Sequence, residues 1–397
     1  MDTNTNAPSK RENPTLAILT HSDKTRIFRG NQENFIDLIR TGAERGVLVY
    51  VMTTADFKLS GRKAVGYTYN EADKTWKKGV FPAPHVIYNR IPYRKFELLP
   101  EVQQVIQTCM RQRRIRFFNP SFFNKWTLFE WLNHAEKTQS YIPDTRRLSS
   151  GEELDKLLAE YPFLYLKPIR GKAGKGIMKV SRSLLDTKSK SFELSIQEKT
   201  KSHISRYPSV SRLWSEVQEL IGGKDYIIQQ GIPLSSYKQR PFDLRVLVQK
   251  NGKGQWSVAG IGARLAGKLS ITTHVPRGGS IDDPAKLLTY SFGGPGSKRI
   301  ITRAKKAALT IAKQIEKSSG HMLGEMSLDL GVDQEGHIWF FEANSKPMKF
   351  DEPPIRKKSL ENLILYSIYL AKRKSKRPPK KTDASPLLAQ TNTERDK

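Results

Sequence analysis

The sequence has very little cysteine, no long apolar run and a shortage of acidic residues. Cys109 is the only cysteine among 397 residues, which excludes an internal disulfide and a thiolate zinc cluster. No apolar run approaches the roughly 20 residues that a membrane-spanning helix needs. The N-terminus also lacks the basic and then apolar pattern of a secretory signal. These absences predict a cytoplasmic protein without a transmembrane segment.

The shortage of acidic residues leaves the chain strongly basic. Its 68 Lys and Arg against 39 Asp and Glu give a formal net charge of +29, and the basic stretch 372–381 holds only seven of the positive charges. A field of this sign favours acidic proteins, anionic lipid surfaces, nucleic acid or other polyanions. The same net charge is also consistent with a highly soluble protein surface that has no polyanionic partner. No helix-turn-helix, RNP or zinc-finger pattern is present, so no specific nucleic-acid motif is predicted.

Residues 324–344 have the pattern of a hairpin that gathers oxygen-bearing side chains on one face. Apolar residues alternate with polar ones or glycine before Glu335-Gly336, which is a turn signal. With these two residues as the loop, Asp329 lies opposite Glu342, and Asn344 points the same way. A four-residue loop would also leave Asp329 and Glu342 on one face. Asp329 alone would fit a solvated polar face, but Glu342 follows four apolar residues, where an unpartnered carboxylate is costly. Mg²⁺ prefers such oxygen ligands, so we predict that these three residues bind magnesium.

A second cluster, residues 165–177, carries lysines and glycines after an apolar strand. Lys167 ends this strand, and a point charge in a partly dry setting suits phosphate. Gly171, Gly174 and Gly176 form a loop in which backbone N–H groups can approach phosphate oxygens. The order of these glycines matches neither the Rossmann fingerprint nor a Walker A motif, so the loop fits a basic turn as well as a phosphate cradle. Upstream, Asn124 is a candidate cap for a helix starting near Lys125, which places that lysine at an anion-binding helix N-terminus.

Taken in order, five segments resemble the ATP-grasp superfamily, and within it the YheC/YheD group of endospore-coat-associated proteins. The resemblance covers roughly residues 15–373, and the segments that carry it are 119–129, 165–176, 229–234, 242–248 and the hairpin 324–344. It implies an α/β (α+β) ATP-grasp fold with an N-terminal α/β lobe and two ATP-binding lobes. The boundaries we predict are a disordered tail over 1–14, the N-terminal domain over 15–118, the central lobe over 119–235, the C-terminal lobe over 236–371 and a basic disordered tail over 372–397.

The resemblance also implies roles for individual residues. Lys125 and Lys167 would contact the phosphates of ATP, and Arg264 would contact the acyl group during transfer. Gln229 and Gln230 lie where many members bind ribose hydroxyls and adenine, and Ile232 would pack on adenine. A glutamate is usual for the ribose contact, and glutamine carries no charge, so this departure bears on nucleotide affinity.

Two further patterns near these segments have more than one interpretation. Asp243 and Arg245 share one face of a predicted strand, which fits a structural ion pair as well as substrate positioning. His274 stands alone between two threonines and a proline-arginine turn. A lone histidine more often stabilises structure through hydrogen bonds, so it is not included among the predicted site residues.

The function expected from this resemblance is ATP- and Mg²⁺-dependent ligation of a carboxylate to an amine through an acylphosphate. The protein would act in the cytoplasm, at the forespore surface or in the spore coat. Its partners would be ATP, unidentified carboxylate and amine substrates, and acidic coat proteins or other polyanions. Two alternatives stay open, namely a coat-assembly scaffold without turnover and a polyanion-binding protein whose basic surface is its main function.

Overall fold

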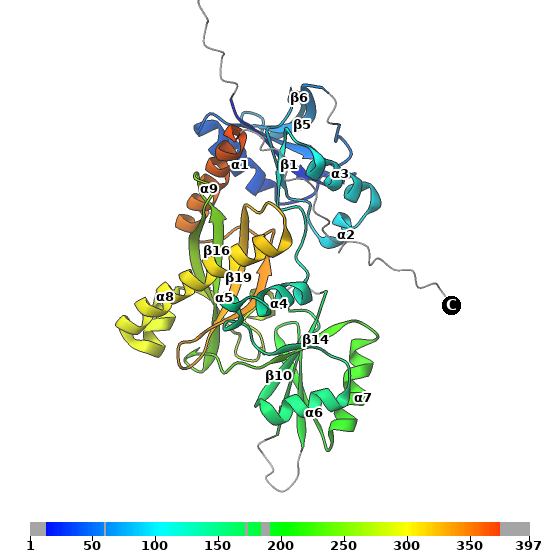
Figure 1. The fold of residues 1–397 in the computed structure, drawn as a ribbon, viewed down its shortest axis with the longest axis vertical. Helices are drawn as coiled ribbons and strands as arrows, with labels where there is room; N and C mark the ends of the chain where they lie inside the picture. Colours follow the sequence, from blue (N-terminus) through cyan, green and yellow to red (C-terminus); the bar gives the residue numbers. More distant parts are fainter. Residues whose placement is uncertain (1–12, 59–60, 171–173, 184–190, 374–397) are drawn as a thin grey trace, which may run out of the picture.

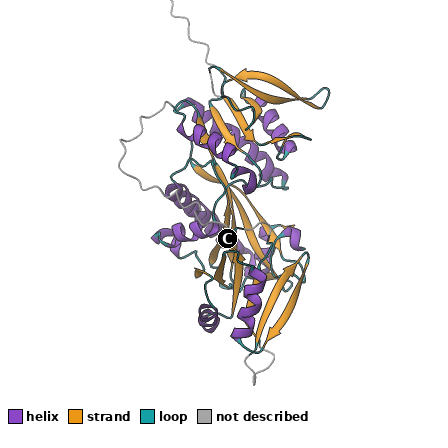
Figure 2. Cartoon of the chain, turned by 90° about the vertical axis from the view of Figure 1, so that its right-hand side faces the viewer, coloured by secondary structure: helices purple, strands orange, loops and turns teal. Residues whose placement is uncertain are grey.

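The computed structural model describes residues 13–58, 61–170, 174–183 and 191–373, which form three lobes along the long axis of the molecule (Figures 1 and 2). Most of the two predicted tails, 1–14 and 372–397, lies outside these residues. Gly171, one of the predicted site residues, also lies outside them. No helix among the described residues has the length and apolar character needed to cross a membrane.

The first lobe is built on a six-stranded sheet in the order β6-β5-β4-β1-β7-β8. Four neighbouring strands, β4, β1, β7 and β8, are parallel, and β5 and β6 add an antiparallel hairpin at one edge. Cys109 is buried on α3, on the same helix face as Val102 and Ile106. The elements of this lobe are β1 (Thr15–Thr20), β2 (Ser22–Asp23), β3 (Ile27–Phe28), α1 (Gln32–Glu44), β4 (Leu48–Thr53), β5 (Lys63–Asn70), β6 (Thr75–Pro82), β7 (Val86–Asn89), α2 (Arg94–Glu97), α3 (Pro100–Arg111) and β8 (Arg116–Phe118).

The second lobe is an antiparallel sheet in the order β13-β12-β11-β10-β14-β9, with α6 and α7 packed on one side. Ser150 caps α6 by accepting a hydrogen bond from the Glu153 amide at 3.2 Å, and Gly222 ends α7 in the left-handed conformation with φ 54°. The elements are α4 (Lys125–Asn133), α5 (Glu136–Gln139), β9 (Thr145–Arg147), α6 (Gly151–Glu160), β10 (Phe163–Pro168), β11 (Met178–Arg182), β12 (Phe192–Glu198), β13 (Lys201–Tyr207), α7 (Val210–Ile221) and β14 (Tyr226–Gln230).

The third lobe contains an antiparallel sheet in the order β18-β17-β16-β19-β20, with β15 paired to β16. The long helix α8 packs on this sheet, and its helical path breaks at Gly293, where φ is 67°. Helices α4 and α5 pack against α8, so the chain enters this lobe before it builds the second sheet. The elements are β15 (Ser236–Tyr237), β16 (Arg240–Lys250), β17 (Trp256–Leu265), the 3-10 turn η1 (Val275–Arg277), β18 (Ser280–Asp282), α8 (Pro284–Ser319), β19 (Glu325–Val332), β20 (Ile338–Asn344) and α9 (Pro353–Lys372).

Asn119 connects the first lobe to both ends of the β19–β20 hairpin. It is fully buried with φ 55°, a left-handed conformation that asparagine tolerates better than most residues. Its side chain accepts a hydrogen bond from the Gly324 amide at 2.7 Å and donates to the carbonyl oxygens of Glu325 and Ser345. Helix α9 strengthens the same junction, because it contacts both β16 and α1. The open end of the hairpin, where β19 begins and β20 ends, is therefore fixed to the first lobe.

Candidate active site

The β19–β20 hairpin places Asp329 opposite Glu342 and Ser327 opposite Asn344. The turn that produces this pairing differs from the predicted two-residue loop. The Asp333 amide donates to the His337 carbonyl at 3.1 Å, and Val332 pairs with Ile338, one residue out of the predicted register. A bulge between Asp329 and Leu330 absorbs the difference, because Phe341 is an extra residue on β20. A slip of one residue would otherwise move Glu342 to the other face, so the bulge restores the pairing of the two carboxylates.

Arg264 lies beneath this carboxylate pair in a buried ion-pair network. Its Nε donates to Asp243 at 2.9 Å, and its Nη2 lies 2.6 Å from the same carboxylate and 2.8 Å from Asp329. Asp243 therefore pairs with Arg264, its neighbour across the strands, and not with Arg245, the pairing considered from the sequence. Arg245 instead lies over the ring of Phe350, 5.6 Å from its centroid.

The network fixes the charges of its members. Burial by itself raises the pKa of Asp329, but Arg264 and then Arg245 outweigh this effect and leave the pKa below its usual value. Burial by itself lowers the pKa of Arg264, but Asp243 and Asp329 reverse that effect and raise it. Asp329 is therefore an anion at neutral pH. Nη1 of Arg264 has no hydrogen bond to any described residue, so two N–H groups of this arginine are available to a substrate.

Lys125 and Lys167 line the same cavity as these carboxylates, Lys125 from α4 and Lys167 from β10. Asn124 caps α4 as predicted, by accepting from the Thr127 amide at 3.3 Å, and Lys125 Nζ lies 3.0 Å from Glu342 Oε2. Lys167, at the end of β10, donates to the side-chain oxygen of Gln229. Its burial, together with repulsion from Lys125, lowers its pKa to about 7. A bound polyanion would return this lysine to its charged form.

The glycine-rich loop is described from Gly174 onward. Gly174 and Gly176 adopt φ values of 70° and 77°, a left-handed region that favours glycine. A Cβ on Gly176 would lie 2.9 Å from the hydroxyl of Tyr226, so the backbone approaches its neighbour too closely for a larger residue. The loop conformation therefore requires glycine at both positions.

The three residues predicted to contact ribose and adenine line one cavity with the lysines and the carboxylates. This cavity has a volume of about 260 Å³. Gln229 is buried and donates to Thr145 Oγ1 at 2.8 Å, and Gln230 accepts from the Asp144 amide at 3.1 Å, so both side chains already have partners within the protein. Ile232 is buried and contributes to an apolar lining that also includes Phe163, Ile177, Leu234 and Phe341.

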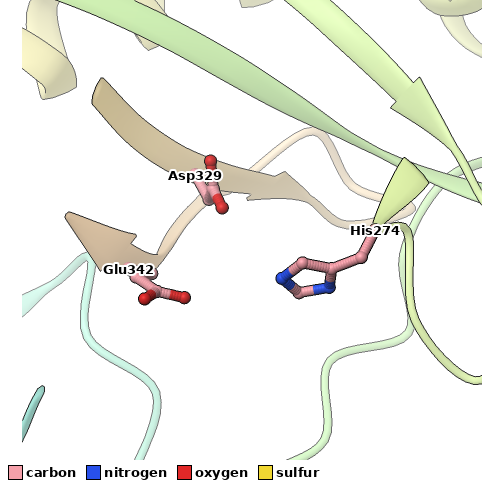
Figure 3. Close-up of side chains that lie close together, drawn as sticks. All are labelled: His274, Asp329 and Glu342. Carbon is pink, nitrogen blue, oxygen red and sulfur yellow. The ribbon is translucent and has the colours of Figure 1, made fainter. Parts of the chain in front are cut away.

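His274 belongs to this site, although its sequence context did not indicate it. Figure 3 shows its imidazole ring pointing toward the space between Asp329 and Glu342, and the ligand atoms of the three residues lie within 4.8 Å of one another. The residue comes from the loop between β17 and β18, far from the hairpin in sequence. Because no periodic pattern links that loop to the hairpin, only the fold reveals the contact.

The donor atoms at this site fit a hard divalent cation. Asp329 and Glu342 offer carboxylate oxygens from facing strand positions. Asn344 is next on the same side of β20, and its side-chain oxygen accepts a hydrogen bond from the Lys346 amide at 3.1 Å, which leaves that oxygen a second lone pair. Lys167 and the glycine loop on the second lobe, together with Lys125 at the start of α4, suit the phosphates of a nucleotide. The cavity therefore brings cation-type and phosphate-type groups together in one place.

Comparison with known proteins places this geometry in context. The family model described as YheC/D like ATP-grasp matches residues 114–370. The endospore coat-associated protein YheD of Bacillus subtilis (strain 168) is 31% identical over 323 residues, which cover 81% of this chain and 69% of the relative. The ATP-grasp ligase PsnB, solved with its minimal precursor, Mg and ADP, has a TM-score of 0.50 at 13% identity and covers 90% of this chain and 98% of its own. The VanG D-Ala:D-Ser ligase from Enterococcus faecalis has a TM-score of 0.50 at 14% identity, with 91% and 100% covered. These two structural matches identify an ATP-grasp fold.

Proposed function

We propose that this chain, which belongs to the YheC/D-like ATP-grasp family, is an ATP-dependent ligase that joins a carboxylate to an amine. The observation that supports this proposal best is that two carboxylates and two lysines line one cavity. Asp329 and Glu342 come from the third lobe, Lys167 comes from β10 of the second lobe, and Lys125 comes from α4, which packs on α8. All four residues line the cavity. An apolar lining next to these charges suits a nucleobase beside its phosphates.

Within this proposal the second lobe holds the nucleotide. Lys167 and Lys125 neutralise phosphate oxygens, and Gly174 and Gly176, both at positive φ, leave backbone N–H groups free of side-chain bulk for close approach to phosphate. Gln229 contacts Lys167 directly, so it positions that lysine in addition to any contact it makes with ribose. Ile232 packs against the adenine ring. The uncharged Gln229 predicts weaker ribose binding than a carboxylate would give.

The third lobe would hold the reacting groups. Mg²⁺, when bound by Asp329, Glu342 and Asn344, would neutralise negative charge on the phosphates. The substrate carboxylate attacks the γ-phosphorus of ATP, the bond to the β-phosphate breaks, and ADP leaves. An amine then attacks the acyl carbon, phosphate leaves, and the amine proton passes to solvent. The free Nη1 of Arg264 donates to the acyl oxygen, where negative charge develops.

The reaction can be tested with purified protein, Mg-ATP and pools of amino acids, short peptides and polyglutamate. ADP release should require a carboxylate substrate, and a new amide product should require an amine as well. Coupled ADP detection and mass spectrometry measure the two steps separately. The Glu342→Gln variant serves as the control for contaminating ATPases, since it should release no ADP. Saturable ATP binding with no ADP from any pool would instead favour a scaffold without turnover.

The similarity to YheD also supports a place of action. That relative is an endospore coat-associated protein, so we infer that this chain acts at the forespore surface or in the spore coat. Immunodetection in coat extracts and in the mother-cell cytosol of sporulating cells checks this inference. Absence from every coat fraction would contradict it.

A second candidate function, polyanion binding, is favoured by one face of α8. Seven basic residues are exposed on this helix after its break at Gly293, and none of these seven forms an ion pair with a described residue. The only acidic residue within α8 is Glu316, which pairs with Lys250 at 2.5 Å. Exposed cations without aromatic neighbours suit a flexible acidic polymer better than stacked bases. The residues are Lys298, Arg299, Arg303, Lys305, Lys306, Lys313 and Lys317.

Charge reversal on this face provides the test. Lys305→Glu, Lys306→Glu and Lys313→Glu together should lower retention on immobilised polyglutamate at low salt. A matched variant reverses three exposed arginines at and just after the end of α3, namely Arg111, Arg113 and Arg114, and changes the net charge equally. If both variants lose retention to the same extent, the effect comes from total charge and not from α8.

A further inference from the structure

His274 has an environment that its neighbours in the protein do not satisfy. Its Nδ1 is buried and has no hydrogen-bond partner among the described residues. Buried polar atoms without a partner are rare in folded proteins, because each costs the free energy of lost hydration. The ring is otherwise held in place, since Thr273 next to it donates to Asp243 at 2.6 Å. The unpaired nitrogen therefore indicates a ligand.

The positions of the two ring nitrogens suggest what that ligand is. One side of the ring points toward Asp329 and Glu342 (Figure 3), with ligand atoms within 4.8 Å. Nδ1 lies at the glycine-rich loop, since a Cβ built on Gly174 would be only 3.3 Å from it. One edge of the imidazole thus meets the two carboxylates, and the other edge meets the loop that would cover the phosphates.

We propose that His274 is a nitrogen ligand of the divalent cation held by Asp329 and Glu342, and that its Nδ1–H donates to a phosphate oxygen beside Gly174. This inference rests on the metal and nucleotide site proposed above. Histidines that bind metals through one ring nitrogen usually donate from the other, which fixes the ring orientation. The same arrangement would satisfy the buried Nδ1.

A mixed nitrogen and oxygen donor set favours Mn²⁺ relative to Mg²⁺, compared with a site made of oxygens alone.

Manganese allows a test that does not depend on activity. Mn²⁺ is added to the full-length protein, alone and with ADP, and pulsed electron paramagnetic resonance is used to detect coupling to the ¹⁴N of a histidine ligand. The wild-type protein should show this coupling, and the His274→Gln variant should lose it. Manganese affinity should fall at least about tenfold in that variant, and the preference for Mn²⁺ over Mg²⁺ should narrow. His203→Gln changes an exposed histidine on β13 and should alter neither result.

The two proposals fail in different ways. If Mn²⁺ binds to the wild-type protein without histidine coupling, or if the coupling persists in His274→Gln, the role of His274 is refuted and the ligase proposal stands. If Mn²⁺ does not bind at all, with or without ADP, the metal site itself is refuted. The thermal transition of His274→Gln should match that of the wild type, which shows that any loss of coupling comes from the ligand and not from unfolding.

Discussion

Lys167 makes ATP binding dependent on pH in a way that can be calculated. Its pKa is about 7 in the free protein because burial and then Lys125 disfavour its charge. From that value it is about 50% protonated at pH 7 and about 10% protonated at pH 8. The phosphates of ATP favour the charged lysine, so its pKa rises well above 8 in the complex. Binding therefore takes up about half a proton at pH 7 and about 0.9 proton at pH 8.

The sign and size of the affinity change follow from this linkage. Because the bound state carries the proton, ATP affinity decreases as pH rises above the pKa of the free protein. Between pH 7 and pH 8 the expected decrease is about fivefold, since the protonated fraction falls from about one half to about one tenth. Calorimetry in excess Mg²⁺, in two buffers with different ionisation enthalpies, measures both the affinity and the proton uptake.

Two variants separate Lys167 from other groups that bind protons. Lys167→Met should bind ATP weakly and should lose this dependence on pH. Lys125→Met removes the second cause of the low pKa, so the pH dependence should persist but move to a higher pH. Equal ATP affinity at pH 7 and pH 8 in the wild-type protein, with no proton uptake, would show that Lys167 does not contact the phosphates.

Three further predictions concern other parts of the site. Glu342→Gln should weaken magnesium-dependent ATP binding at least about tenfold in calorimetry. The thermal transition of the ATP-free protein should change little, because Glu342 is only half-buried. Wild-type ATP affinity in this variant would refute the metal assignment. Gly176→Ala should reduce ATP affinity, since a Cβ would meet Tyr226 and the φ of 77° disfavours alanine. The matched control is Gly223→Ala, which is also at positive φ but has open space around it, and it should leave ATP affinity unchanged. Asp243→Asn should destabilise the protein by about 3–5 kcal/mol in denaturant unfolding, because it breaks a buried pair with Arg264; a loss below 1 kcal/mol would contradict a structural role for this pair.

Some features of the site are visible in local sequence patterns. Alternation around Asp329 and the apolar run before Glu342 place both carboxylates on one hairpin face, since side chains on a strand alternate. The Asn124 cap is also predictable, because asparagine before a helix satisfies an amide that would otherwise lack a partner. The order of the motifs indicates the ATP-grasp fold, which the family match establishes.

The register of the hairpin shows the limit of such local reasoning. The predicted two-residue loop was wrong, because Asp333 organises a longer turn by accepting from the Glu335 and His337 amides. The predicted pairing of Asp329 and Glu342 still occurs, because the bulge at Phe341 compensates for that turn. Bulges depend on how a strand packs against its neighbours, and alternation along one strand does not encode them.

The sequence by itself determined which residues have the chemistry for this site and on which strands or loops they lie, because strand alternation, helix caps and glycine loops depend on near neighbours in the chain. Only the tertiary structure decided which of these residues meet. Arg264 pairs with both Asp243 and Asp329 because three strands lie side by side. His274 reaches the hairpin carboxylates because the β17–β18 loop folds back across the cavity. Such contacts depend on the packing of distant segments, and no local pattern specifies them.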